Sequence, residues 1–283
     1  MRILRNAELS VRFRCVIPLR FLPLHSIFAM IERTSTLLFV LFAVGFYSCT
    51  PSDRLTLKNG IWRGVLTIQG IELPMNFEIN NSIGLRVYLI NADERIEIDE
   101  GKIVGDSLYL PMHIFDAHIT AKITETSISG SWTKIYEDDY SLSFEAVHDD
   151  ADRFRNTTSS QTFSSKWRVT FIHAEVSDTT EAVGIFRSEN NKMSGTFLTP
   201  TGDYRFLEGT ASDEEMKLTT FDGGHAFLFT ATTVSEDSIA GHFWSGAHWH
   251  ETWYDVRDEN AELPNLDSLT FIKESYDGLD YEY

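Results

Sequence analysis

The alternation of apolar and polar residues between Ser194 and Trp253 is the feature that most constrains the fold of this chain. Apolar residues recur there at every second position, for example at Met216 and Leu218, which is the spacing of one face of a β-strand. Segments rich in Gly, Asp, Pro and Thr separate these runs, and such residues accept the backbone angles of tight turns. The pattern therefore predicts a sheet that folds back on itself through successive hairpins.

The same pattern occurs twice along the chain. A Trp-Arg pair stands near the start of each copy, and a Ser-Ile-x-Gly segment stands near the end of each. The paired segments are Trp62-Arg63 with Trp167-Arg168, and Ser127–Gly130 with Ser238–Gly241. Their common order predicts two related modules at 58–148 and 166–257, which a polar linker at 149–165 joins.

Each module contains enough short strands to close into an eight-stranded barrel, because sequential hairpins can remove their exposed edges by closure. We therefore predict an all-β protein of two tandem antiparallel meander modules, which can form up-and-down barrels of the calycin type. An open meander or a sandwich is the alternative. In the second module the expected strands are 166–173, 182–188, 192–199, 204–211, 215–220, 225–232, 238–243 and 252–257.

The N-terminal part has the composition of a targeting segment. Residues 35–48 form an apolar run that Cys49 follows directly, and Arg33 gives a positive flank. This order resembles a bacterial lipoprotein signal peptide and predicts that Cys49 becomes the lipidated first residue. A secretory signal with a chance cysteine and an uncleaved anchor are the alternatives.

That interpretation divides the N-terminal part into an upstream extension at 1–29, a signal peptide at 30–48 and a tether at 49–57. It places the protein in the cell envelope, where the lipid holds it on the membrane facing the periplasm. The net charge of −18 excludes a nucleic-acid partner, because no basic excess is available to neutralise phosphates. Both cysteines, Cys15 and Cys49, precede the modules, which excludes a cysteine nucleophile or a Cys-x-x-Cys pair there.

Three histidines near the end of the second module form a candidate metal site. In an extended strand His248 and His250 lie on one face, where they could bind Zn²⁺ or Cu²⁺. His242 could supply a third ligand across a hairpin. The alternative is that these imidazoles cap a polar strand end. No other metal and no cofactor is expected.

A second candidate is Asp222 with His225, which could form a general base oriented by a carboxylate. The first module contains a similar grouping of Asp116 and His118, and this favours a structural role in a hairpin, in which the Asp side chain accepts turn amides. We therefore predict no catalytic residue.

Aromatic residues could line the interior of the modules. A barrel can hold a small apolar ligand when its interior is not filled by side chains. A packed core is the alternative for a barrel of this size. The residues predicted to line the interior are Trp62, Trp167, Phe171, Phe197 and Phe227.

Three strings of the second module carry a resemblance to a known family: SGTFLTPTGDYRFLEG at 194–209, LTTFDGGHAFL at 218–228 and GHFWSG at 241–246. They resemble the N-terminal region of Bacteroidetes envelope proteins of the TlpA/ResA type. These proteins are membrane-anchored thiol–disulfide oxidoreductases with a C-terminal thioredoxin-like domain. The resemblance covers most of residues 56–272.

The resemblance implies a non-catalytic role for this chain. The family's redox chemistry belongs to a Trp-Cys-x-x-Cys motif in the thioredoxin-like domain, and this sequence has no such motif. We interpret the acidic segment 258–283 as a linker toward that absent domain. The expected function is therefore an accessory or binding region that is not itself an enzyme, with a thioredoxin-like domain or its client protein as partner. The alternative is a stand-alone lipocalin-like lipoprotein that binds a small apolar ligand or a protein.

Overall fold

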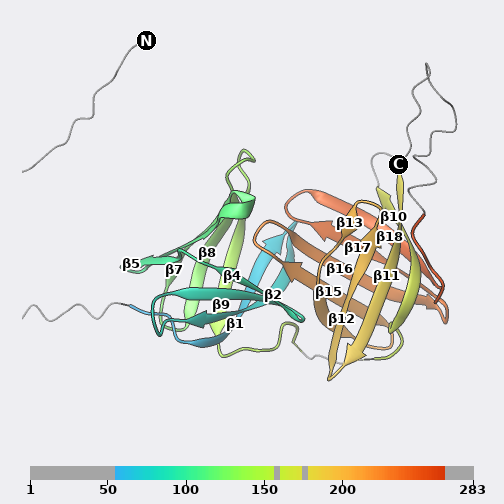
Figure 1. The fold of residues 1–283 in the computed structure, drawn as a ribbon, viewed down its shortest axis with the longest axis horizontal. Helices are drawn as coiled ribbons and strands as arrows, with labels where there is room; N and C mark the ends of the chain where they lie inside the picture. The colour runs from blue at the N-terminus through green and yellow to red at the C-terminus, as the bar shows by residue number, and fades with distance from the viewer. Residues whose placement is uncertain (1–54, 156–159, 174–177, 265–283) are drawn as a thin grey trace, which may run out of the picture. The chain divides into compact units, whose positions relative to one another are not determined.

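The computed structural model describes residues 55–155, 160–173 and 178–264 (Figure 1). The predicted signal peptide, the lipidation site Cys49 and residues 265–283 of the predicted acidic linker lie outside the described residues. In the part of the chain that the structure describes, no helix is long and apolar enough to cross a membrane.

The described chain is all-β, as predicted, and its strands form two antiparallel sheets. Among the described residues, the one helical element is a single 3₁₀ turn, η1 (His113–Phe115). The first sheet consists of β1 (Gly60–Ile68), β2 (Ile71–Asn80), β3 (Arg86–Asn91), β4 (Glu94–Ile98), β5 (Lys102–Val104), β6 (Ser107–Met112), β7 (Ala117–Ile123), β8 (Ser127–Lys134) and β9 (Ser141–His148). Their spatial order is β4-β3-β2-β1-β9-β8-β7-β6-β5.

The second sheet consists of β10 (Ser165–His173), β11 (Thr179–Glu189), β12 (Lys192–Thr199), β13 (Gly202–Asp203), β14 (Leu207–Ala211), β15 (Glu215–Phe221), β16 (Ala226–Ser235), β17 (Ser238–Ser245) and β18 (Trp249–Arg257). It pairs its strands as the first sheet does and adds one pairing, between β12 and β14. The order is β11-β10-β18-β17-β16-β15-β14-β12-β13, and β11 also pairs with β12. Because β12 pairs with both β11 and β14, eight strands close into an up-and-down barrel, which confirms the predicted closure for the second module.

The first sheet stays open as a half-barrel, and the length of one strand explains the difference. In the barrel, β13 covers only Leu198 and Thr199 of β12, so β14 can pair with 193–195 of the same strand. In the first sheet, β4 pairs with β3 along 87–91 and occupies its free edge. The strand that follows, β5, therefore pairs only with β6.

The observed strands of the second module agree with the expected ones to within a few residues. The main difference is at Tyr204–Phe206, which was expected to begin a strand but forms a loop before β14. Arg205 in this loop has a left-handed backbone with φ of 59°. Its amide donates a 3.1 Å hydrogen bond to the side chain of Asp203, so the chain turns there instead of extending.

The two modules place equivalent tryptophans in equivalent positions. Trp62 and Trp167 are fully buried, one in each core. Each indole Nε1 donates a 3.0 Å hydrogen bond to the carbonyl oxygen four residues earlier, that of Lys58 and of Phe163 respectively. The same local contact in both sheets agrees with the repeat found in the sequence.

The barrel completes the core of the half-barrel. Along β16, Phe227 and Phe229 belong to the barrel core, whereas Ala226 and Leu228 belong to the core of the first sheet. Phe221, at the end of β15, also packs in the first core. A strand that is buried on both faces reads as a continuous apolar run, which is the pattern of Ala-Phe-Leu-Phe in this strand.

Candidate functional site

The interior of the barrel is an aromatic core. The predicted lining residues Trp167, Phe171, Phe197 and Phe227 are all buried there, whereas Trp62 lies in the core of the other module. The ring centroids of Phe171 and Phe197 are 5.2 Å apart, within the range of favourable aromatic packing. These side chains therefore fill the barrel against one another.

Tyr204, in the loop between β13 and β14, packs against this core. Its ring centroid lies 5.0 Å from that of Phe243 and 5.4 Å from those of Phe227 and Phe229. Burial, with a smaller effect of the nearby Glu251 carboxylate, raises the pKa of the phenol to about 12. No sequence pattern marks this residue, because a Tyr at the start of an apparent strand looks like any other strand residue.

The neighbouring residue, Arg205, links this loop to both modules. Its Nε lies 2.9 Å from Oδ2 of Asp222, and its Nη1 donates a 3.1 Å hydrogen bond to Oε1 of Glu94 on β4. The position of Tyr204 is therefore coupled through one side chain to the turn after β15 and to the first sheet.

Asp222 and His225 meet as predicted, with Oδ2 and Nδ1 2.9 Å apart. The other carboxylate oxygen accepts the amides of Gly224 at 2.8 Å and His225 at 2.6 Å. Burial alone would raise the pKa of Asp222, but the hydrogen bonds from His225 and the amides hold it below its usual value. Both carboxylate oxygens are thus used to fix the turn, which is the structural role that the sequence favoured for Asp222.

Glycine lets this turn approach the first module closely. A Cβ atom on Gly224 would lie 2.4 Å from the ring of Phe115 in η1. The corresponding pair in the first module is arranged differently. Asp116 ends η1 with a left-handed backbone, and its carbonyl oxygen accepts the amide of Ile135 at 2.8 Å, while His118 packs its ring 5.5 Å from that of Tyr109.

Two of the three predicted metal-binding histidines come together. His242 Nδ1 and His250 Nε2 are 3.0 Å apart, and their rings stack at an interplanar angle of 17°. Burial, followed by the influence of His242, lowers the pKa of His250. His248 lies in the turn before β18, where its ring packs edge-on against Tyr140. Among the residues that the structure describes, no group of three or more His, Cys, Asp or Glu side chains is arranged to hold a metal ion.

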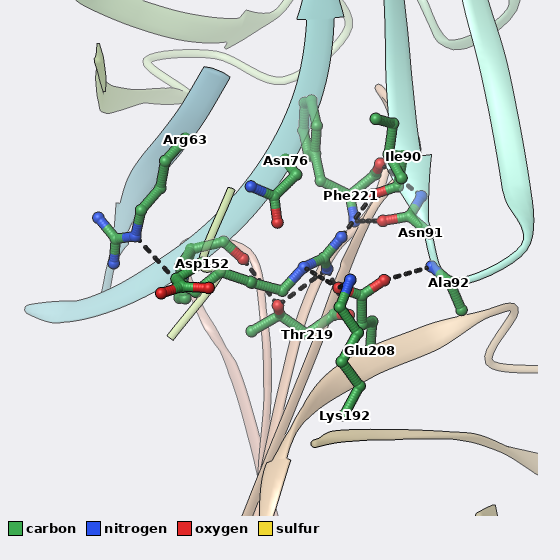
Figure 2. Close-up of polar contacts among 12 residues, drawn as sticks. Arg63, Asn76, Ile90, Asn91, Ala92, Asp152, Lys192, Glu208, Thr219 and Phe221 are labelled. Atoms are coloured by element: carbon green, nitrogen blue, oxygen red, sulfur yellow. Dashed lines mark hydrogen bonds and ion pairs between the residues drawn. The ribbon is translucent and has the colours of Figure 1, made fainter. Parts of the chain in front are cut away.

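A buried polar network joins the two modules (Figure 2). At its centre Arg153 is only 3% exposed, although its position falls in the segment that composition marks as a linker. Its guanidinium donates 3.0 and 3.2 Å hydrogen bonds to the carbonyl and hydroxyl oxygens of Thr219 on β15, and a further one to the carbonyl oxygen of Ile90 on β3. The Nε atom lies 3.7 Å from Oε1 of Glu208, an ion pair without a direct hydrogen bond.

The partners of Arg153 are themselves held from both sides. Glu208 accepts the amide of Ala92 at 3.0 Å and the ammonium of Lys192 at 3.1 Å. Asn91 exchanges two hydrogen bonds with the backbone of Phe221, at 3.0 and 3.2 Å, as a paired strand would. Burial lowers the pKa of Arg153, and the Glu208 carboxylate opposes that effect. No local sequence pattern indicates this network, because its members are far apart along the chain.

No protein-family model matches the chain, and no curated protein matches it. The solved structures that are similar to parts of it include the following three. EF1p2_mFAP2b bound to DFHBI has 12% identity and a TM-score of 0.27, with coverage of 36% of this chain and 98% of that one. A Nostoc punctiforme protein of unknown function from the DUF3598 family has 11% identity and a TM-score of 0.25, with coverage of 71% and 96%.

The third structure is a Myxococcus xanthus hemagglutinin in complex with a mannopentaose, with 10% identity, a TM-score of 0.18 and coverage of 71% and 91%. Likeness at this level does not transfer a ligand or an activity to this chain. By its fold, the described chain is an all-β protein with one closed antiparallel barrel and one half-barrel.

Proposed function

We propose that this chain is a non-catalytic binding scaffold of the cell envelope, the accessory region of a TlpA-like thiol–disulfide oxidoreductase, which positions a thioredoxin-like domain or holds its client protein. The observation that carries this proposal is the junction between the modules. A shared apolar core and the buried polar contacts oppose independent motion of the two sheets. Separation would break the hydrogen bond from Arg153 to Ile90, that from the Ala92 amide to Glu208, and the exchange between Asn91 and Phe221. A rigid support is what a positioning role requires.

The polar groups with catalytic potential support the same proposal. The Asp222 carboxylate is occupied by Arg205, His225 and two backbone amides. These contacts hold a turn at the junction, and breaking them to perform proton transfer would loosen the contact between the modules.

We place the partner-binding surface at one end of the half-barrel. Three large apolar side chains are exposed there, Ile114 in η1 at 91%, Ile135 at 66% and Tyr136 at 61%. A 2.8 Å hydrogen bond from the Ile135 amide to the carbonyl oxygen of Asp116 ties the β8–β9 loop to the turn after η1. Clustered exposed apolar residues commonly mark sites of protein interaction. This end lies opposite Gly60, where β1 begins, because β9 starts beside the end of β1.

A binding measurement tests this proposal. The full chain is titrated with a thioredoxin-like domain that carries Trp-Cys-x-x-Cys, in the presence of a chelator, by isothermal calorimetry. We expect binding, and we expect the combined variant Ile114→Ser, Ile135→Ser and Tyr136→Ser to weaken it at least about 10-fold, because the apolar contact area is lost.

The matched control is Ile83→Ser. Ile83 is likewise an exposed apolar residue, at 84%. It follows β2, whose last residues pair beside Gly60 at the other end of the sheet. The control should bind like the unmodified chain. Absence of binding, or equal weakening by the control, would contradict the proposal.

A second candidate function is that of a small-molecule carrier. The closed barrel favours it, because Tyr204, which packs against the barrel core, lies in a loop and not in a strand. If the Tyr204 ring can leave the aromatic core, a small apolar ligand could take its place beside Phe243 and Phe227. Tyr204→Ala should then bind an environment-sensitive apolar dye more tightly than the unmodified chain, and a competing apolar compound should displace it. Ile83→Ser again serves as the control. Equal dye binding by all three proteins would exclude this function.

A further inference from the structure

We propose that His242 and His250 form a two-imidazole binding site for Cu²⁺ or Ni²⁺ on the outer face of the barrel. This inference is independent of the proposed scaffold function. In the pairing of β17 with β18, Trp244 lies opposite His250 and His242 lies opposite Thr252. His242 and His250 are therefore diagonal neighbours on one face of an antiparallel pair, close enough for their rings to meet.

The distance between the two nitrogen atoms fits a shared metal ion. His242 Nδ1 and His250 Nε2 are 3.0 Å apart. Two nitrogens at this separation, each about 2.05 Å from one ion, subtend an angle of about 94° at the ion. A tetrahedral Zn²⁺ site would need a separation of about 3.3 Å. The angle is thus closer to that of adjacent ligands in the square or octahedral geometry of Cu²⁺ and Ni²⁺.

The surroundings hold the two rings in place and leave them accessible. The ring of Trp244 stacks on both imidazoles, with centroids 5.3 Å from that of His242 and 5.2 Å from that of His250. His242 is exposed and His250 is partly exposed, so an ion can reach the nitrogens from solvent. Rings that are already stacked lose less side-chain entropy on binding than free ones.

Metal binding would exchange the hydrogen bond between the two imidazoles for two bonds to the ion. Without metal, one ring donates an N–H to the lone pair of the other. With metal, both facing nitrogens must present lone pairs, so the donor ring moves its proton to its outer nitrogen and the ion replaces the shared hydrogen bond. Water fills the remaining coordination positions. The net charge of −18 favours the approach of a cation.

The test uses the full chain with Cys15 and Cys49 alkylated, titrated with CuSO₄ in a weakly coordinating buffer. Binding is followed by calorimetry and by quenching of tryptophan fluorescence, because Trp244 lies beside the ion. We expect His242→Gln and His250→Gln each to weaken this Cu²⁺ site at least about 10-fold, since one of two protein ligands is lost. Trp244→Phe should retain binding by calorimetry and lose most of the quenching.

His248→Gln is the matched control, because this histidine is close in sequence but packs on Tyr140 instead of joining the pair. It should bind Cu²⁺ like the unmodified chain. Binding unchanged in His242→Gln, or weakened equally in His248→Gln, would overturn the proposal, and so would tighter binding of Zn²⁺ than of Cu²⁺. Circular dichroism checks folding, and if His250→Gln does not fold, the exposed His242 variant decides the question.

Discussion

Replacing Arg153 by Met tests whether the buried network holds the two modules together. The Met side chain keeps much of the apolar volume of the Arg stem but removes every polar contact of the guanidinium. Thr219 and Ile90 would lose hydrogen bonds to their carbonyl oxygens, and Glu208 would lose its buried cation at 3.7 Å.

The expected magnitude follows from these partners. Breaking a buried ion pair from one side costs about 3–5 kcal/mol, because the remaining charge stays buried. Glu208 keeps the Lys192 ammonium and the Ala92 amide, which places the loss near the lower end, at about 3 kcal/mol. With an m-value of about 3 kcal/mol/M, the urea midpoint should fall by about 1 M.

Urea unfolding followed by tryptophan fluorescence measures this change, and Arg168→Met is the matched control. Arg168 is 52% exposed and pairs with Asp258 at 2.6 Å on the surface, so the same substitution there should leave the midpoint unchanged within error. A midpoint for Arg153→Met that equals that of Arg168→Met would refute the conclusion that the network stabilises the junction.

Two further predictions concern a buried carboxyl group and two glycines at close strand contacts. Burial raises the pKa of Asp255 well above its usual value, and neither of its carboxyl oxygens has a hydrogen-bond partner. The unfolded chain releases this proton near pH 4 while the folded chain keeps it, so the free energy of unfolding falls as the pH rises toward the folded pKa. Asp255→Asn should therefore raise the Tm at neutral pH and flatten its decline above about pH 4 in thermal scans; an unchanged slope would contradict this. Gly130→Ala and Gly241→Ala should each cost about 3 kcal/mol or more, because the new Cβ would lie 2.0 Å from the carbonyl oxygen of Thr120 and 1.8 Å from that of Thr230. Ser129→Ala is the exposed control in the same denaturation assay, and equal stability of these variants would count against the close strand contact.

Local features of the sequence were enough to predict the strands of the barrel. The run at 192–199 coincides with β12, because its period of two and its flanking turn residues act within a few positions. The pairing of Asp222 with His225 was also predictable, since the two residues share one turn. Of the three predicted metal-binding histidines, only His242 and His250 contact each other, across the hairpin of β17 and β18. His248 does not join them, because β18 begins at Trp249 and leaves His248 in the preceding turn.

The sequence by itself determined the all-β class and the two-fold repetition of Trp62 and Trp167, because alternation and turn chemistry are properties of neighbouring residues. Only the tertiary structure decided which sheet closes, since closure depends on whether β4 or β13 leaves an edge free. It likewise decided that Arg153 is a buried link between modules. That role depends on contacts with residues more than sixty positions away, and such distant partners leave no local pattern.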